Sequence, residues 1–163
     1  MSSFPKDFLW GAATSSHQVE GGNHNDWSEW EQQNANRLAK EAEQTFGKFP
    51  SWSHIQKEAT NPQNYISGIA CDHYHRFRED FDIAKKLGHN AHRFSIEWSR
   101  IEPEEGKFDE KEIEHYAQVI RALRERGIEP FVTLWHWPLP VWVAQNGGWE
   151  SSKIIHFFSR YCQ

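Results

Sequence analysis

The sequence predicts an α/β fold in which short strands alternate with helices. Strand-like apolar segments occur at residues 8–14, 90–96 and 129–135, and a segment with helical spacing follows each of them. This alternating order is typical of parallel strands joined by right-handed helical crossovers. Polar and aromatic residues gather where each strand ends, which is where ligands bind in parallel α/β folds.

The first strand and the polar stretch after it come first along the chain. Residues 8–14, FLWGAAT, predict a short buried strand that ends in small residues. Residues 21–70 are rich in Asn, Gln, Ser and Gly, with Pro50 and Pro62 as breakers. A stretch of about fifty residues is too long for a simple connection, so we expect a long first βα loop with some structure of its own. Residues 35–46 within it have the composition of a helix.

The two clearest helices follow this stretch and the second strand. Residues 72–88 carry apolar side chains at helical spacing, and Asp72 is placed to cap the start of that helix. Residues 109–127 show the same spacing, and Asp109 and Glu112 stand three residues apart, as in a capping box. The apolar, β-branched residues that follow predict a third buried strand.

Composition and charge restrict the class of protein. The 163 residues carry a net charge of −5, which argues against a nucleic-acid or anionic-membrane partner, because either would need a basic face. No segment approaches the ~20 apolar residues of a membrane span, and the N-terminus lacks the pattern of a signal peptide. Cys71 and Cys162 lie far apart and are expected to be free, buried thiols. We therefore expect a cytoplasmic protein, and its oligomeric state stays open.

Metal and cofactor sites are not expected. The chain has 10 His residues, but His73 and His75 fall on different faces of a helix, which is poor geometry for shared ligation. No HExxH motif, cysteine pair or glycine-rich phosphate loop is present in the sequence. We expect neither a bound metal nor a cofactor.

The stretch TLWHWPLP, residues 133–140, follows the third strand. The imidazole of His136 can make one directed hydrogen bond to a hydroxyl, and the indole of Trp137 offers a flat apolar face. A sugar presents apolar C–H faces and a ring of hydroxyls, so the two side chains match it chemically. The alternative is that His136 is a core histidine with satisfied hydrogen bonds and that Trp135, Trp137 and Trp142 are packing residues.

Four polar residues near the ends of the first two strands are further candidates. The amide of Gln18 suits two adjacent hydroxyls, although a solvated loop glutamine would look the same. Glu20 and Glu97 could each act as a catalytic acid or could stabilise the structure around them. Arg93 lies in the middle of a strand, and a buried arginine is costly unless it is paired. Its carboxylate partner could be Glu20, Glu97 or a group outside this chain.

Several segments together resemble the N-terminal part of glycoside hydrolase family 1, the β-glucosidase and β-galactosidase family. They are FPKDFLWGAATSSHQVEGG, DHYHRFREDFDIAKKLGHNAHRFSIEWSRIEP, FDEKEIEHYAQVIRALRERGIEPFVTLWHWPLPVWV and GGW, in the family's order. Within residues 21–70 little beyond NDWSEWE aligns. The resemblance implies that residues 1–163 are the N-terminal portion of a single (β/α)8 TIM barrel domain, incomplete, with about three βα units.

The resemblance also implies a reaction, the retaining hydrolysis of terminal β-D-glucosides or galactosides by two glutamates about 5 Å apart. The family carries these glutamates on strands four and seven, so we expect both outside this chain and expect the chain alone to be inactive and poorly folded. Gln18, His136 and Trp137 match family residues that bind the non-reducing sugar, and Arg93 matches the arginine that lies against the nucleophile. A small β-glycoside or oligosaccharide is the expected partner.

Two positions depart from the family pattern. His17 stands where Tyr or Phe is usual, and Pro138 replaces a common Asp, so the preference for glucose or galactose stays open. A second interpretation is a non-catalytic sugar-binding or regulatory barrel derivative. Such a protein would keep Gln18, His136 and Trp137 but would need no glutamates.

Overall fold

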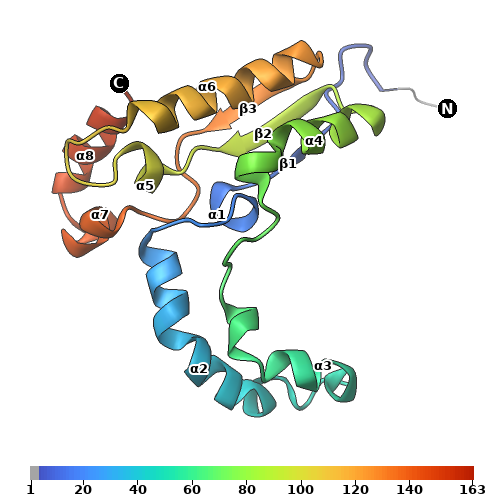
Figure 1. Cartoon of the computed structure of the whole chain (residues 1–163), viewed down its shortest axis with the longest axis vertical. Helices are drawn as coiled ribbons and strands as arrows, with labels where there is room; N and C mark the ends of the chain where they lie inside the picture. Colours follow the sequence, from blue (N-terminus) through green and yellow to red (C-terminus); the bar gives the residue numbers. More distant parts are fainter. Residues whose placement is uncertain (1–3) are drawn as a thin grey trace.

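A computed structural model describes residues 4–163, in which strands and helices alternate as the sequence predicts (Figure 1). The elements, in chain order, are β1 (Gly11–Ala13), α1 (Ser16–Val19), α2 (Asp26–Phe46), α3 (Trp52–Ala59), the 3-10 helix η1 (Pro62–Tyr65), α4 (His73–Lys86), β2 (Ala91–Ser95), α5 (Trp98–Ile101), α6 (Glu110–Glu125), β3 (Glu129–Thr133), α7 (Val141–Gln145), the 3-10 helix η2 (Gly148–Glu150) and α8 (Lys153–Tyr161).

The three strands form one parallel sheet with β2 in the middle. The register places Arg93 of β2 beside Ala13 of β1 on one side and beside Phe131 of β3 on the other. The helices α4, α6 and α8 follow β1, β2 and β3, so the fold consists of three βα units, as predicted. Figure 1 shows the short helices α1, α5 and α7 near the carboxyl ends of the strands.

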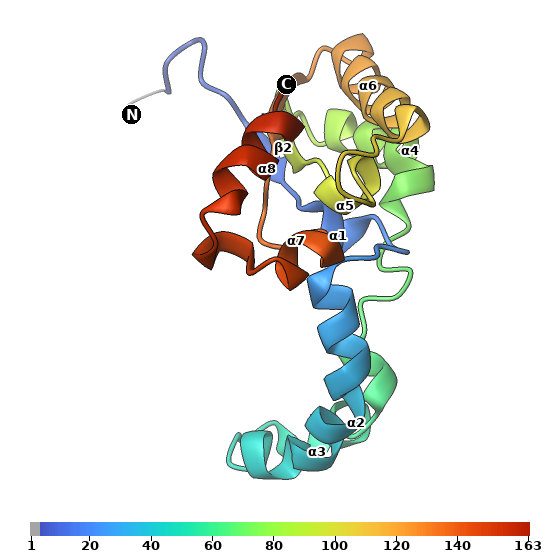
Figure 2. The same ribbon diagram turned by 90° about the vertical axis from the view of Figure 1, so that its left-hand side faces the viewer.

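The hydrophobic core lies between the sheet and the three long helices that follow its strands. Figure 2 shows α4 and α6 together on one side of the body and α8 on the other. The buried aromatic side chains of the core are Phe77, Phe81, Phe94, Trp98, Tyr116, Phe157 and Tyr161. Within it, the rings of Trp98 and Tyr161 stack with their centroids 4.8 Å apart, which joins α5 to α8.

The two outer strands are exposed, which corrects the prediction that residues 8–14 and 129–135 are buried. All three residues of β1 are exposed, and Phe131 and Val132 of β3 are 45% and 38% exposed. Successive side chains of a strand point to opposite faces, so both faces of β3 are partly bare. In residues 4–163, β1 and β3 each pair with β2 alone, and no further strand covers their outer edges.

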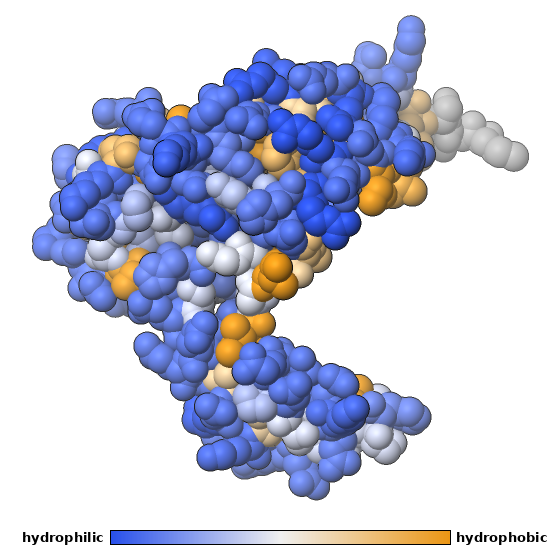
Figure 3. Space-filling model, viewed as in Figure 1, coloured by the Kyte–Doolittle hydropathy of each residue, from blue (hydrophilic) through white to orange (hydrophobic). Residues whose placement is uncertain are grey.

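Residues 21–70 form a helical arm that projects away from the body (Figures 1 and 2). The helix expected at residues 35–46 is the second half of α2, which begins at Asp26 because Asn25 and Ser28 form a capping box. Figure 3 shows a mainly hydrophilic surface in which hydrophobic side chains gather where the arm meets the body.

Two predicted helix caps behave differently. The carboxylate of Asp109 accepts backbone N–H groups of the first turn of α6, as predicted, but Glu112 accepts a hydrogen bond from the Tyr74 hydroxyl at 2.9 Å instead of closing a capping box. Asp72 stands before α4 without capping it. Its backbone is left-handed, with φ 55°, and its Oδ1 lies 2.7 Å from His75 Nδ1.

The cysteines and the helix lengths bear on the remaining sequence expectations. Cys71 and Cys162 are free, but both are exposed, so the prediction of buried thiols is wrong. Cys71 lies between η1 and α4, and Cys162 directly follows α8.

Among residues 4–163, no helix combines the length and the apolar character needed to cross a bilayer. The same residues contain no cluster of three or more side chains arranged to hold a metal ion.

His92 on β2 predicts a pH dependence of stability. It is 6% exposed, and its Nδ1 has no hydrogen-bond partner in the described residues. Burial, reinforced by His73, His89 and Arg93, lowers its pKa to about 4. Because the pKa of His92 is lower in the folded state than in the unfolded chain, protonation of His92 opposes folding. The contribution of His92 to the free energy of unfolding is therefore greatest above about pH 6.5, and it is lost as the pH falls towards 4.

We expect a His92→Phe variant to lose less stability than the wild type between pH 6.5 and 4. The difference in free energy of unfolding should reach at most about 3 kcal/mol, because each pKa unit corresponds to about 1.4 kcal/mol. Urea unfolding at a series of pH values measures it. His54→Phe, at an exposed position on α3, is the matched control, and parallel curves for wild type and His92→Phe would contradict the prediction.

The bare face of β3 predicts self-association of the isolated chain. An exposed strand edge with apolar neighbours is a template for pairing with another chain, and an added lysine opposes such pairing. We expect Val132→Lys to shift the isolated 163-residue chain towards the monomer in sedimentation velocity. Gln33→Lys adds the same charge to the arm and should leave association unchanged. Equal association of both variants would show that β3 is not the contact.

Candidate functional site

Arg93 and His136 meet at the carboxyl edge of the sheet. Nη1 of Arg93 donates to the backbone oxygen of Thr14 at 2.8 Å and lies 3.3 Å from His136 Nδ1. Thr14 follows β1 and His136 follows β3, so the guanidinium on the central strand joins the segments that leave both outer strands. The segments after β1 and β3 therefore meet at the carboxyl edge of the sheet, which we call the rim.

The contact with Arg93 determines the protonation of His136. A guanidinium only donates hydrogen bonds, so Nδ1 of His136 must accept and the proton of the neutral ring lies on Nε2. Partial burial, followed by the positive charge of Arg93, lowers the pKa of His136. Both effects favour the neutral ring, whose Nε2–H can donate to a hydroxyl.

Trp137 is exposed on a strained loop. Its side chain is 61% exposed, and its backbone has φ 82°, in the left-handed region that non-glycine residues rarely adopt. The indole N–H of Trp135 donates to the Pro138 oxygen at 3.0 Å, and Pro138 and Pro140 are buried, which fixes the loop. Trp135 packs against the core, whereas Trp137 does not. The packing interpretation thus holds for Trp135 and Trp142 but not for Trp137.

Gln18 lies on α1, directly after β1, and is exposed. Its backbone N–H donates to the Ser15 oxygen at 3.1 Å. The side chain makes no hydrogen bond to Arg93, His136 or Trp137 in the part of the chain that the structure describes. Gln18 therefore shares the rim with the other predicted residues through its position in the fold and not through direct contact.

Glu97 is a buried carboxylate at the end of β2 that is satisfied by neutral donors. It is 2% exposed, and it accepts hydrogen bonds from Ser16 Oγ at 2.8 Å, Ser99 Oγ at 2.8 Å and Asn25 Nδ2 at 3.3 Å. These contacts favour the structural interpretation of Glu97, because its carboxylate oxygens are already occupied.

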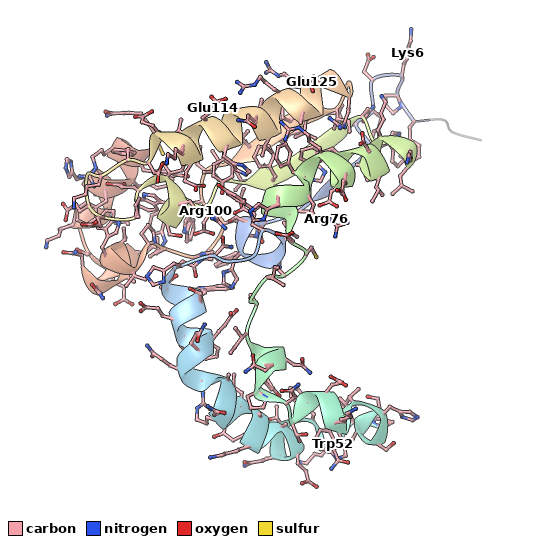
Figure 4. All side chains as sticks on the ribbon, in the orientation of Figure 1. Lys6, Trp52, Arg76, Arg100, Glu114 and Glu125 are labelled. Atoms are coloured by element: carbon pink, nitrogen blue, oxygen red, sulfur yellow. The ribbon has the colours of Figure 1, made fainter. Side chains whose placement is uncertain are left out.

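Glu20 binds Arg100 and Tyr116. Arg100 belongs to α5 and is labelled in Figure 4. Nε of Arg100 donates to Glu20 at 3.1 Å, and the Tyr116 hydroxyl donates at 2.9 Å. Burial raises the pKa of Glu20 to about 7, despite the opposing charge of Arg100. Arg93 therefore pairs with neither Glu20 nor Glu97, and among residues 4–163 it makes no salt bridge.

Sequence reasoning missed the contacts that join the arm to the rim. His17 Nε2 lies 2.9 Å from Glu31 on α2 and 3.2 Å from Ser67 Oγ on the returning segment. Ser67 also donates to Glu31 through both its backbone N–H and its hydroxyl. The departure from the family pattern at His17 was the only sequence signal, and its partners are 14 and 50 residues away.

An open cavity lies beside the first two turns of α2, which we call the root of the arm. It has a volume of about 690 Å³ and is lined by Asp26, Trp27, Trp30 and Glu31, all from α2. Trp27 and Trp30 are 44% and 52% exposed. The His17 ring meets the Trp27 ring edge-on, with the centroids 5.6 Å apart.

Comparison with known proteins gives one consistent family. The model for glycosyl hydrolase family 1 matches residues 1–163. Beta-glucosidase A of Thermotoga maritima is 39% identical over 160 residues, which are 97% of this chain and 32% of the relative. Beta-glucosidase 42 of Arabidopsis thaliana is 39% identical over 163 residues, covering 98% of this chain and 30% of the relative.

Solved structures of glycosidases are also similar to this chain. The beta-glycosidase from Pyrococcus horikoshii is similar with a TM-score of 0.76 at 40% identity, over 97% of this chain and 31% of that chain. The family 1 beta-glucosidase from Thermotoga maritima gives a TM-score of 0.79 at 35% identity, over 99% of this chain and 32% of that chain.

The chain spans about a third of the length of these relatives. Its three parallel strands with their helices therefore correspond to part of a (β/α)8 barrel, which confirms the predicted fold class. The matches over nearly the whole chain confirm the resemblance seen in the sequence: this chain belongs to glycosyl hydrolase family 1.

Proposed function

We propose that these residues form part of the sugar-binding pocket of a retaining β-glycosidase acting on terminal β-D-glucosides or galactosides. In this proposal Gln18, His136 and Trp137 bind the non-reducing sugar. Both catalytic glutamates lie outside the 163 residues, and Arg93 supports the nucleophile. The membership in glycosyl hydrolase family 1 supports the glycosidase role.

The observation that carries the proposal is the contact between Arg93 and His136. The guanidinium is half-buried at the carboxyl edge of the sheet without a carboxylate in residues 4–163, while Glu20 and Glu97 are occupied elsewhere. Burial of an arginine costs less free energy when a carboxylate pairs with it than when its charge is left unpaired. A glutamate from another part of the barrel would supply this partner.

The residues after β3 support the sugar half of the proposal. His136 carries its proton on Nε2, where it can donate to a hydroxyl, and the exposed Trp137 indole offers an apolar face beside it. The family 1 beta-glucosidase from Thermotoga maritima has been solved in complex with deoxynojirimycin and with castanospermine. By similarity, we propose a small β-glycoside or oligosaccharide as substrate. We also propose a cytoplasmic location.

A chimaeric enzyme tests the proposal. Residues 1–163 would replace the matched third of beta-glucosidase A of Thermotoga maritima, and hydrolysis of a chromogenic β-glucoside would be measured. We expect turnover by the chimaera and none by the isolated 163-residue chain, because the chain lacks the catalytic carboxylates. Gln18→Ala should lower kcat/KM of the chimaera roughly 10- to 100-fold, as expected for lost hydrogen bonds to the sugar.

The matched control is Gln33→Ala, which removes an exposed glutamine of the arm and should leave kcat/KM unchanged. The proposal fails if the isolated chain hydrolyses the substrate and Glu20→Gln or Glu97→Gln abolishes that turnover. Either result would place a catalytic carboxylate inside these residues.

Calorimetry separates catalysis from the alternative of a non-catalytic sugar-binding module. We expect no saturable heat when glucose or cellobiose is titrated into the isolated chain, because the pocket is only partly built. Saturable binding that Trp137→Ala removes would instead support the binding module.

A further inference from the structure

The first turn of α2 contacts the segments that follow all three strands. Nδ2 of Asn25 lies 3.2 Å from His17 Nδ1, in the segment after β1, and 3.3 Å from Glu97 Oε1, after β2. The neighbouring Asp26 pairs with Leu139, after β3. Two consecutive residues at the root of the arm therefore join three parts of the rim.

Asn25 uses its hydrogen-bonding groups fully. It is 0% exposed. Its two amide hydrogens serve His17 and Glu97, its Oδ1 accepts the Ser28 backbone N–H at 2.8 Å, and its own backbone N–H donates to Ser28 Oγ at 2.9 Å. A buried amide with every group paired has one orientation. That orientation fixes the distance between the segments after β1 and β2.

Asp26 holds the loop that contains Trp137. Its backbone N–H donates to the Leu139 oxygen at 3.0 Å, and its Oδ1 accepts the Leu139 N–H at 2.7 Å. Leu139 lies two residues after Trp137, whose φ of 82° is unfavourable without support from its surroundings. The paired contacts with Asp26 provide this support from outside the loop.

We propose that Asn25 and Asp26 are positioning residues of the sugar site. They hold α1, with Gln18, and the loop with His136 and Trp137 in a fixed relation, so the geometry of the site depends on the root of the arm. The role in sugar binding rests on the proposed function, whereas the mechanical coupling does not.

Simple helix capping by Asn25 is the competing explanation, and two substitutions separate it from positioning. Asn25→Asp keeps the acceptor that caps α2 but removes the donors to His17 and Glu97. Asp26→Asn keeps an acceptor for the Leu139 N–H, whereas Asp26→Ala removes it. Glu29→Ala, in the same first turn of α2, is the matched control.

Amide hydrogen exchange on the chimaeric enzyme tests the coupling directly. We expect Asp26→Ala to accelerate exchange at Leu139 roughly tenfold, as for the loss of one hydrogen bond, and Asp26→Asn to restore most of the protection. Asn25→Asp should accelerate exchange at Gln18. Asp26→Ala, Asn25→Asp and Glu29→Ala should all leave exchange at the amide of Leu123, a buried residue of α6, unchanged. Unchanged exchange there would show that the acceleration elsewhere does not come from a loss of global stability.

Three outcomes would overturn the coupling. They are a wild-type chimaera whose Leu139 amide exchanges like an unfolded peptide, equal effects of Asp26→Ala and Glu29→Ala, and acceleration that extends to Leu123. In the chimaeric enzyme, Asp26→Ala should lower kcat/KM for the β-glucoside roughly tenfold, and Asp26→Asn should restore it. An inactive wild-type chimaera would contradict the proposed function, while the exchange result would still decide the coupling.

Discussion

The buried carboxylate of Glu97, at the end of the central strand, constrains the whole rim of the sheet. A charged group removed from water costs several kcal/mol unless surrounding donors replace its hydration. Here the donors are Ser16, Ser99 and Asn25, which come from three different segments. The backbone N–H of Glu97 donates to the Tyr116 hydroxyl, so the same network reaches α6. These segments cannot move independently without leaving a buried charge unsatisfied.

The sequence predicted the elements that depend on local chemistry. The apolar spacing and the Asp109 cap locate α6, and the order of strands and helices gives the parallel sheet. The start of α2 was missed although Asn25 and Ser28 carry a capping signal, because the polar composition of residues 21–70 suggested a loop. The burial of β1 and β3 could not be predicted from their composition, because it depends on which strands lie beside them.

Side-chain chemistry suggested the candidate site residues, whereas the residues that hold them in place could be identified only from the fold. Trp137 and His136 stand out in the sequence as an aromatic pair at the end of a strand. Asp26, which lies 113 residues before its partner Leu139, carries no such signal. Contacts of this kind depend on the fold bringing the start of α2 to the carboxyl edge of the sheet, and local patterns contain no information on this approach.

The charge distribution at the rim supports the proposed division of binding and chemistry within one barrel. Glu20 and Glu97 accept hydrogen bonds from hydroxyl groups, an amide and Arg100. These two buried carboxylates therefore hold the segments of the rim together. Arg93 uses one nitrogen for Thr14 and His136, and a guanidinium has five N–H donors in all. Its remaining donors suit a carboxylate that another strand brings to the same edge. In the proposed enzyme, this third of the barrel would orient the sugar and the nucleophile, while the reacting carboxylates would come from the strands that close the barrel.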